Sequence, residues 1–508
     1  MAYLLGIDLG TSGLKTVLFD ENGAEIASAS AEYPLYVPAG GMAEQDAEDW
    51  WRAACDTVRE TVARAGIAPE SIAGVGLSGQ MHGVVPLGAD AKPLRRAIIW
   101  CDQRSGAQCE EMTALVGRDR LVAITANPAI TGFSASKILW LRENEPETFE
   151  KIRHILLPKD YLRLRLTGEF ATEVSDASGT QLLDVPHRCW SGELLAALEL
   201  PREWFPDVYE SPVISGRVSR EAAALTGLAP GTPVAGGAGD QAAGAVGLGI
   251  VRPGLMSSTI GSSGVVFAHT GSPRIDARGR VHTFCHAVPG AWHVMGVTQA
   301  AGLSLRWFRD EFCAAERETA AALGCDPYIL MDDEAARVAP GAEGVFYLPY
   351  MNGERTPHLD PDARAVFFGM NASHTRAHLL RAVMEGVVYS LRDSYEILGE
   401  LGLSVDTVRV AGGGAKSGLW RQMQADMFGV PAARMNVAEA PALGAAVLAG
   451  VGAGIYASVP EACGHVVLPR DRVMPDPDAG AVYARHYPLY RALYEALREP
   501  YRTLAALS

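Results

Sequence analysis

A short turn of glycine and hydroxyl residues occurs twice in the chain, and its repetition constrains the fold more than any other feature. The first copy reads Asp8-Leu-Gly-Thr-Ser-Gly13 and the second reads Thr259-Ile-Gly-Ser-Ser-Gly264, an offset of 251 residues in a chain of 508. Each copy lies between two apolar, β-prone runs, which is typical of a tight hairpin. Short glycine and hydroxyl strings often match by chance, but the shared strand–turn–strand setting favours a duplicated unit.

The chain length and one seam in the sequence agree with this duplication. At roughly 150 residues per domain, 508 residues suggest either about three domains or two large ones. Near residues 249–254 a glycine-rich helix gives way to a Pro-Gly turn before a new strand. Together with the repeat, this seam predicts an N-terminal domain of residues 1–249 and a C-terminal domain of residues 250–508.

Strands and helices alternate along the chain. Residues 3–9 and 14–19 read as two strands joined by the first turn. Asp46 is expected to cap a helix that runs to about Ala65 and ends at Gly66. Further strands are expected at residues 24–33, 72–77, 255–260, 265–269 and 407–411, and further helices at residues 137–144, 159–166, 377–401 and from about residue 417. This alternation predicts an α/β fold.

Charge, apolar stretches and cysteines exclude several classes of protein. A formal charge of −15 repels phosphate backbones, so we expect no general nucleic-acid binding. Residues 440–460 are long enough to cross a bilayer but consist mostly of alanine and glycine, so we expect a buried helix and no membrane partner. Eight scattered cysteines without a Cys-x-x-Cys pair, and a start without a basic, apolar leader, indicate a cytoplasmic protein with reduced thiols.

The two repeated turns have the composition of a phosphate-binding hairpin. Glycine and hydroxyl residues at a hairpin tip present backbone N–H groups and side-chain hydroxyls to an anion. Asp8, at the end of the preceding strand, can hold a magnesium ion beside the phosphates. The candidate phosphate contacts are Thr11, Ser12, Lys15, Gly261 and Ser262. The alternative is an ordinary tight turn with a surface aspartate.

A third glycine turn, Gly412-Gly-Gly-Ala-Lys-Ser417, lies between a strand and a helix. Three adjacent glycines exceed what a plain turn requires and allow a flat ligand to lie against the backbone. The candidate ligand contacts are Gly413, Gly414, Lys416 and Ser417. No P-loop string occurs, and the Gly-x-Gly-x-x-Gly at residues 74–79 lies within and just past a strand, so neither standard nucleotide signature applies.

Asp240 is the acidic residue that most resembles a general base. It stands in Gly236-Gly-Ala-Gly-Asp-Gln-Ala-Ala-Gly244, where glycine and alanine offer little charge compensation. If Asp240 is desolvated, its pKa is raised, which suits a base. The alternative is a helix N-cap. A possible metal cluster, His282-Thr-Phe-Cys-His286, has no second ligand pair nearby, so a packed, hydrogen-bonded strand is the favoured interpretation there.

Taken together, these residues resemble the FGGY carbohydrate kinase family, within the actin-like ATPase superfamily. Both family signature segments are present, Gly132-Phe-Ser-Ala-Ser-Lys-Ile-Leu-Trp-Leu-Arg-Glu-Asn144 and Ala365-Val-Phe-Phe-Gly-Met370 with the following residues 378–385. Strings typical of the members that act on D-xylulose are Gly79-Gln-Met-His-Gly83, Leu157-Pro-Lys-Asp-Tyr-Leu-Arg-Leu-Arg-Leu-Thr-Gly-Glu-Phe170 and Gly353-Glu-Arg-Thr-Pro-His358. The resemblance runs from Tyr3 to about Leu448.

The resemblance implies a two-lobed actin-like ATPase fold with duplicated, ribonuclease H-like domains and a cleft between the lobes. It also implies ATP-dependent phosphorylation of D-xylulose at its 5-hydroxyl, giving D-xylulose 5-phosphate and ADP, with ATP and Mg²⁺ as cofactors. In the family, Asp240 matches the general base and Asp8 the aspartate near magnesium, while the turn of Thr11 and Ser12 touches phosphate. The residues that match the sugar site are Met81, His82 and Gln241, and the triple-glycine turn matches the adenosine site.

The chain departs from the family pattern at two places. Trp100-Cys-Asp-Gln-Arg104 replaces a segment often written Trp-Asn-Asp-Gly-Arg, so Trp100, Asp102 and Arg104 are kept as sugar-pocket candidates while the changed pair alters its frame. The second turn carries serine at position 262 where threonine is commoner, which keeps the hydroxyl.

Two other functions remain open at this point. One is a kinase of the same family for another ketopentose or a polyol. The other is a non-catalytic, actin-like nucleotide-binding protein, which gives Asp240, Met81 and His82 no joint role. The family also suggests a homodimer.

Overall fold

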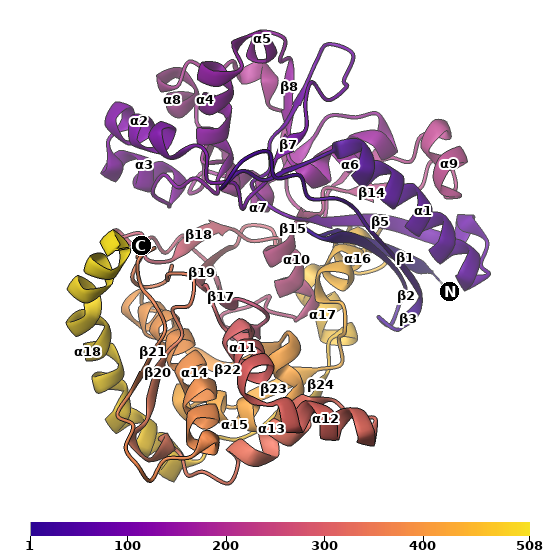
Figure 1. The fold of residues 1–508 in the computed structure, drawn as a ribbon. Helices are drawn as coiled ribbons and strands as arrows, with labels where there is room; N and C mark the ends of the chain where they lie inside the picture. The colour runs from indigo at the N-terminus through magenta and orange to yellow at the C-terminus, as the bar shows by residue number, and fades with distance from the viewer. Residues whose placement is uncertain (1, 508) are drawn as a thin grey trace.

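The computed structural model describes residues 2–507, and two large mixed sheets dominate it (Figure 1). The N-terminal sheet runs in the order β13 (Ile214–Arg217), β14 (Pro233–Ala235), β5 (Ile72–Gly79), β1 (Tyr3–Leu9), β2 (Gly13–Asp20) and β3 (Glu25–Glu32), with β15 (Ala238–Gly239) also paired to β5. The C-terminal sheet runs in the order β18 (His282–Cys285), β19 (Trp292–Thr298), β17 (Gly264–Thr270), β16 (Gly254–Ile260), β22 (Val405–Ala411), β23 (Ala432–Met435) and β24 (Pro469–Val473).

The two sheets share one arrangement around the repeated turn. β1 pairs antiparallel with β2 and parallel with β5, while β16 pairs antiparallel with β17 and parallel with β22. Each copy of the turn joins the two antiparallel strands of its sheet, so the copies occupy equivalent positions. The predicted α/β fold of two duplicated lobes is confirmed.

The first helix shows how closely local sequence sets an element. α1 (Ala47–Ala65) begins after Asp46, whose side chain accepts a hydrogen bond from the Glu48 N–H, and it ends at Gly66 in the left-handed conformation. Both ends match the prediction because capping depends only on neighbouring residues. The other predicted helices are also present, as α4 (Ser134–Asn144), α6 (Pro158–Thr167), α14 (Arg376–Glu400) and α15 (Gly418–Phe428).

Helices cover both faces of the N-terminal sheet. Leu5, Ile7 and Leu9 of β1 pack into one buried cluster with α1, whereas Leu4 packs into another with α10 (Asp240–Gly247) and α16 (Ala440–Gly452). This alternation follows from the two-residue period of a strand. Asp8 therefore faces the same side of the sheet as α10 and α16.

The helix α16 comes from the C-terminal half of the chain but lies on the N-terminal sheet (Figure 1). It also packs against α10, which comes from the N-terminal half, so helices of the two halves meet across the seam near residue 249. Because α16 belongs to one half of the chain and packs on the sheet of the other, the division into residues 1–249 and 250–508 remains a prediction. α16 is the buried helix that we expected in the alanine- and glycine-rich stretch.

The close packing of α16 requires glycine in the strands beneath it. A Cβ at Gly6 would overlap the carbonyl of Ala442, and one at Gly76 would overlap the carbonyl of Ala445. Gly76 belongs to the Gly-x-Gly-x-x-Gly string that we rejected as a nucleotide signature, and here it lets a helix approach a sheet. These two glycines therefore serve the packing of α16 on the N-terminal sheet.

The remaining elements complete the two lobes. In the N-terminal half they are α2 (Gly106–Val116), α3 (Arg118–Thr125), α5 (Pro146–Phe149), α7 (Val174–Ala177), α8 (Gly192–Ala197), α9 (Arg220–Thr226) and the short strands β4 (Glu44–Gln45), β6 (Val85–Leu87), β7 (Ala97–Ile98), β8 (His154–Leu156), β9 (Thr172–Glu173), β10 (Leu183–Asp184), β11 (Cys189–Trp190) and β12 (Val208–Tyr209). In the C-terminal half they are α11 (Gly302–Phe312), α12 (Ala314–Leu323), α13 (Pro327–Ala335), α17 (Val459–Val466), α18 (Pro477–Leu507), β20 (Phe346–Leu348) and β21 (Val366–Phe368). Within residues 2–507, no helix combines the length and apolar character needed to cross a bilayer.

Candidate active site

Two aspartates lie at the same end of three neighbouring parallel strands. Asp8 of β1 is in register with Ser78 of β5, and Ala238 of β15 is in register with that same Ser78. Asp240 follows β15 directly and is the first residue of α10. The N-cap position belongs to Gly239, so the alternative that Asp240 is the N-cap is wrong by one residue.

Burial perturbs the acidity of both carboxyl groups. Desolvation, and after it the negative charge of Asp8, raises the pKa of Asp240 to about 7. Desolvation also raises the pKa of Asp8 to about 6, although the hydroxyl of Ser78, which donates to Asp8 Oδ1 at 2.7 Å, opposes this shift. A carboxyl with a pKa near 7 can take up and release a proton at neutral pH, as a general base must.

Asp240 lines a cleft of about 710 Å³ between the lobes. Gln241 lines it from the same helix, and Gly413 and Lys416 line it from the third glycine turn of the C-terminal lobe. The cleft thus brings the candidate base and two candidate nucleotide contacts to one space, although they are far apart in the sequence.

A second cavity of about 560 Å³ lies in the C-terminal lobe beside this cleft. Its lining includes the predicted contacts Gly261, Ser262, Gly413, Gly414, Lys416 and Ser417, together with the apolar side chains of Leu305, Ile329 and Trp420. Gly413 and Lys416 line both cavities, so the two spaces meet at the third glycine turn. Gly412, with a φ of 75°, starts this turn in a conformation that favours glycine.

The two repeated turns are both tightly closed. The Gly10 N–H donates to the Gly13 carbonyl at 3.0 Å, and the Gly261 N–H donates to the Ser263 carbonyl at 2.9 Å. Thr11 and Ser12 form the tip of the first turn. One turn lies on the N-terminal sheet and the other on the C-terminal sheet, so each lobe carries one turn, as a two-sided phosphate clamp requires.

Lys15 joins the two halves of the chain. Its Nζ lies 2.6 Å from Glu439 Oε1, and Glu439 lines the cleft just before α16. Lys15 also stands opposite Asp8 in the β1–β2 pair, and its charge lowers the pKa of Asp8. Lys15 is therefore committed to an ion pair beside the cleft, in addition to its predicted role as a phosphate contact.

Met81 and His82 lie next to the strand that leads to Asp240. The Met81 side chain packs so closely on Gly239 that a Cβ there would lie 2.8 Å from Met81 Cγ. His82 has a φ of 69°, which is uncommon for a residue other than glycine, and its backbone carbonyl accepts hydrogen bonds from Ser134 Oγ and Lys137 Nζ. Two side chains thus hold His82 in this conformation.

The tautomer of His82 follows from its hydrogen bond. Nδ1 lies 2.9 Å from the Gly179 carbonyl, which can only accept, so Nδ1 carries the proton and Nε2 is an acceptor. Burial lowers the pKa of His82 well below its usual value, so the ring is neutral at pH 7. The ring packs against Phe133 with centroids 4.5 Å apart. His82 thus offers one fixed acceptor to a ligand.

In the segment of residues 100–104, which differs from the family pattern, Asp102 and Arg104 are paired with each other, whereas Trp100 contacts the first turn. Asp102 is fully buried and accepts hydrogen bonds from the Ala43 N–H at 2.6 Å and the Arg104 N–H at 2.9 Å. Arg104 forms ion pairs with Asp102 and Glu44, both at 2.8 Å. These two residues therefore satisfy each other and brace the loop. Trp100 is partly exposed and donates to Thr11 Oγ1 at 2.8 Å, which links it to the first turn.

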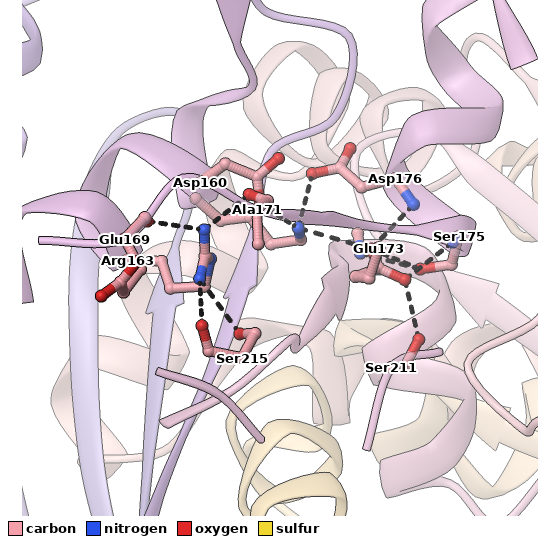
Figure 2. Close-up of polar contacts among 11 residues, drawn as sticks. Asp160, Arg163, Glu169, Ala171, Glu173, Ser175, Asp176, Ser211 and Ser215 are labelled. Atoms are coloured by element: carbon pink, nitrogen blue, oxygen red, sulfur yellow. Dashed lines mark hydrogen bonds and ion pairs between the residues drawn. The ribbon is translucent and has the colours of Figure 1, made fainter. Parts of the chain in front are cut away.

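Figure 2 shows a buried network around Glu173 and Ser175 to which sequence reasoning gave no role. Glu173 accepts hydrogen bonds from the Ser175 N–H at 2.7 Å and from the Ser211 hydroxyl at 2.7 Å. The Ser175 hydroxyl in turn accepts from the Gly239 N–H at 3.2 Å, one residue before the candidate base. Lys159 lies within 3.4 Å of both Glu173 and Asp176 and supplies the positive charge of this network. Lys159 lies in residues 157–170, a segment that carries the family resemblance, and nothing else in the sequence indicated a role for it.

The histidine-rich strand is packed and hydrogen-bonded, as favoured. β18 is buried throughout, and His282 Nδ1 lies 2.9 Å from Asn127 Oδ1. His286, just beyond the strand, places Nε2 3.0 Å from the Ile250 carbonyl. Residues 2–507 contain no group of three or more His, Cys, Asp or Glu side chains arranged to hold a metal ion.

Comparisons with known proteins place the chain in a family. It matches the N-terminal domain of the FGGY family of carbohydrate kinases over residues 3–247 and the C-terminal domain over residues 256–453. It is 40% identical to the xylulose kinase of Bacillus subtilis (strain 168) over 494 residues, which is 97% of each chain. It is 32% identical to the gluconokinase of the same organism over 511 residues, covering 99% of this chain and 98% of that one.

A solved structure agrees with this assignment. The crystal structure of a xyloylose kinase from Brucella ovis, 36% identical, superposes with a TM-score of 0.89 over 98% of this chain and 99% of that one. The family match spans both lobes and includes the segments that build the cleft, the three glycine turns and Asp240. The chain therefore belongs to the FGGY family of carbohydrate kinases.

Proposed function

We propose that the protein transfers the γ-phosphoryl group of ATP to the 5-hydroxyl of D-xylulose, which gives D-xylulose 5-phosphate and ADP. The observation that carries this proposal is the 40% identity to a xylulose kinase over 97% of both chains, compared with 32% identity to a gluconokinase. The strings at residues 79–83 and 353–358, which are typical of members that act on D-xylulose, favour the same substrate.

Asp240 acts as the general base in this reaction. Its carboxylate takes the proton of the 5-hydroxyl as the sugar oxygen forms a bond to the γ-phosphorus, and the bond from that phosphorus to the β-γ bridging oxygen of ATP breaks. The pKa of about 7 supports this role because the carboxylate is present at neutral pH yet basic enough to hold the proton. Gln241, next in the helix, lines the same cleft and is a candidate sugar contact.

The sugar lies against Met81 and His82. Nε2 of His82 accepts a hydrogen bond from a sugar hydroxyl, while the Met81 side chain packs on Gly239 and holds the floor of the site close to the base. Trp100, through Thr11, and the braced pair of Asp102 and Arg104 frame the pocket.

The nucleotide occupies the two joined cavities. The adenosine enters the cavity lined by Ile329 and Trp420, and the phosphates run past Gly413 and Lys416 into the cleft that holds Asp240. The turn at Gly261 and Ser262 and the turn at Thr11 and Ser12 then face the phosphates from the two lobes, where backbone N–H groups and hydroxyls hold the charged oxygens.

Asp8 fits a magnesium ion. It is a half-buried carboxyl that accepts a hydrogen bond from Ser78, and its negative charge raises the pKa of Asp240. Mg²⁺ is usually held by one or two carboxylates together with phosphate oxygens and waters, so a single carboxylate beside the phosphates suffices. The bound ion would neutralise charge on the phosphate oxygens. Lys15 supplies a fixed cation nearby.

We further infer that the lobes of residues 1–249 and 250–508 close over the sugar, which keeps water from the γ-phosphate. The packing of α10 against α16 lies where such a motion must be accommodated. We propose that the protein works in the cytoplasm as a homodimer.

A coupled assay of ADP release tests the proposed function. The purified protein is given ATP and Mg²⁺ with D-xylulose, other pentuloses, polyols or D-gluconate, one at a time. We expect the highest kcat/KM with D-xylulose. Preference for another sugar would show a kinase of the same family that acts on that sugar. Turnover independent of any sugar would favour a nucleotide-binding protein without a sugar acceptor.

A further inference from the structure

The segment Gly353-Glu-Arg-Thr-Pro-His358 is rigidly held on both sides of Arg355. Glu354 accepts hydrogen bonds from the Gln299 N–H at 2.9 Å and the Arg355 N–H at 2.7 Å. Thr356 donates its N–H to the Val297 carbonyl at 2.9 Å, and its hydroxyl accepts from the Val297 N–H at 3.1 Å. Both neighbours are buried. The backbone at Arg355 is therefore fixed to the edge of the C-terminal sheet.

The guanidinium of Arg355 has no ion pair, side-chain hydrogen bond or aromatic partner among residues 2–507. Other arginines that are equally or more buried all have partners: Arg104 pairs with Asp102, Arg163 donates to the Ser215 and Ala171 carbonyls, and Arg381 pairs with Glu385. A partly buried guanidinium without acceptors loses hydration and gains nothing in return. Such an arrangement is expected where a ligand supplies the missing acceptors.

The surroundings of Arg355 place it near the sugar end of the site. Its neighbour Thr356 is bonded to Val297 of β19, two residues from Met295, which is in register with His282 of β18. The His282 ring lies 5.7 Å from that of Phe133, and Phe133 packs against His82. Burial and then the charge of Arg355 lower the pKa of His282 to about 3, and the same charge acts on His82.

Arg355 thus lies on the same side of the site as His82 and His282, whose rings both pack against Phe133. His82 offers an acceptor, whereas Arg355 offers only donors, so the two side chains present complementary groups to one ligand.

We propose that Arg355 is a substrate-binding residue of the C-terminal lobe, whose guanidinium donates to a ketone or hydroxyl oxygen of the sugar beside His82. This inference rests on the proposed function. It makes sugar recognition a task of both lobes, since His82 belongs to the N-terminal lobe. A bound sugar then links the lobes and favours the closed state.

The variant Arg355→Met keeps the length of the side chain and removes its donors, and Arg252→Met removes a surface arginine as a matched control. A hydrogen bond from a charged donor corresponds to roughly a 10- to 100-fold effect on binding. We expect the KM for D-xylulose to rise by about that factor in Arg355→Met, with the KM for ATP within about twofold and an unchanged melting temperature. Arg252→Met should match the wild type.

A second measurement separates binding from a merely structural role. In Arg355→Ala, guanidinium added at millimolar concentration should partly restore the KM for D-xylulose, which a loss of packing would not allow. A folded Arg355→Met protein with the wild-type KM, or an Arg355→Ala protein without rescue, would overturn the inference. If the wild type instead prefers another sugar, the proposed substrate fails, and the same two tests with that sugar judge Arg355 independently.

Discussion

The acidity of Asp240 predicts how the reaction depends on pH. Only the carboxylate can take the proton of the sugar hydroxyl, and burial together with the charge of Asp8 raises its pKa to about 7. A group with this pKa is roughly one-tenth ionised at pH 6 and nine-tenths ionised at pH 8. We therefore expect kcat/KM for the sugar to rise about tenfold between these pH values, where an ordinary aspartate would leave it flat.

Replacing the base should abolish this dependence along with most of the activity. Asp240→Asn keeps the shape of the side chain but cannot accept the proton, so we expect kcat to fall by roughly 10²- to 10⁴-fold. ATP binding should persist, because the cavity proposed for the adenosine is lined by residues of the C-terminal lobe and not by Asp240. The variant should be at least as resistant to heat as the wild type, because the substitution removes one of two buried carboxylates that repel each other.

The measurement is a pH series of initial rates in the coupled assay, with ATP binding followed separately by calorimetry. Asp393→Asn is the matched control, since Asp393 is also buried with a pKa of about 7 but bonds Tyr487 in the C-terminal lobe. It should retain the acid limb of the profile. Near-normal turnover of Asp240→Asn, or a wild-type profile that is flat from pH 6 to pH 8, would refute the assignment of the base.

Three further predictions follow from the packing around the site. His82→Ala should raise the KM for D-xylulose roughly tenfold with little change in the KM for ATP, since it removes one hydrogen-bond acceptor; an unchanged sugar KM contradicts that contact. Gly76→Ala should destabilise the protein by about 1–3 kcal/mol, seen as a lower melting temperature, because the added methyl group overlaps the carbonyl of Ala445; an unchanged melting temperature would show that α16 can shift. Glu173→Gln should lower kcat more than it raises either KM, because Glu173 orients Ser175, which holds the residue before Asp240; equal losses in kcat and stability, with both KM values raised, would indicate a structural role only.

The elements with local signals could be read directly from the sequence. Asp46 and Gly66 bound a helix through hydrogen bonds to their own neighbours, and the first strand follows from a mostly apolar run of seven residues. The duplication could be predicted from the repeated turn, because each copy is closed by a hydrogen bond between its own residues. Asp240 could be singled out because its glycine and alanine neighbours offer no compensating charge, and desolvation does raise its pKa.

What the sequence could not give is any relation that joins distant segments. Asp102 and Arg104 were expected to contact the sugar, but which partners they have depends on a loop folding beside Glu44. Whether they reach the sugar stays a prediction. The network of Lys159, Glu173 and Ser175 likewise has no characteristic spacing, because its members lie on α6, β9 and α7 and meet only in the folded protein.

The sequence alone determined the local elements, the duplication, the family resemblance and the identity of the candidate base. The tertiary structure alone decided that α16 crosses to the opposite sheet, that two cavities meet at Gly413 and Lys416, and that the Arg355 side chain has no partner among residues 2–507. The physical reason is one of range. Capping, turn formation and strand alternation act between residues a few positions apart. Burial, charge pairing and the shape of a cavity depend on which surfaces meet when the chain folds.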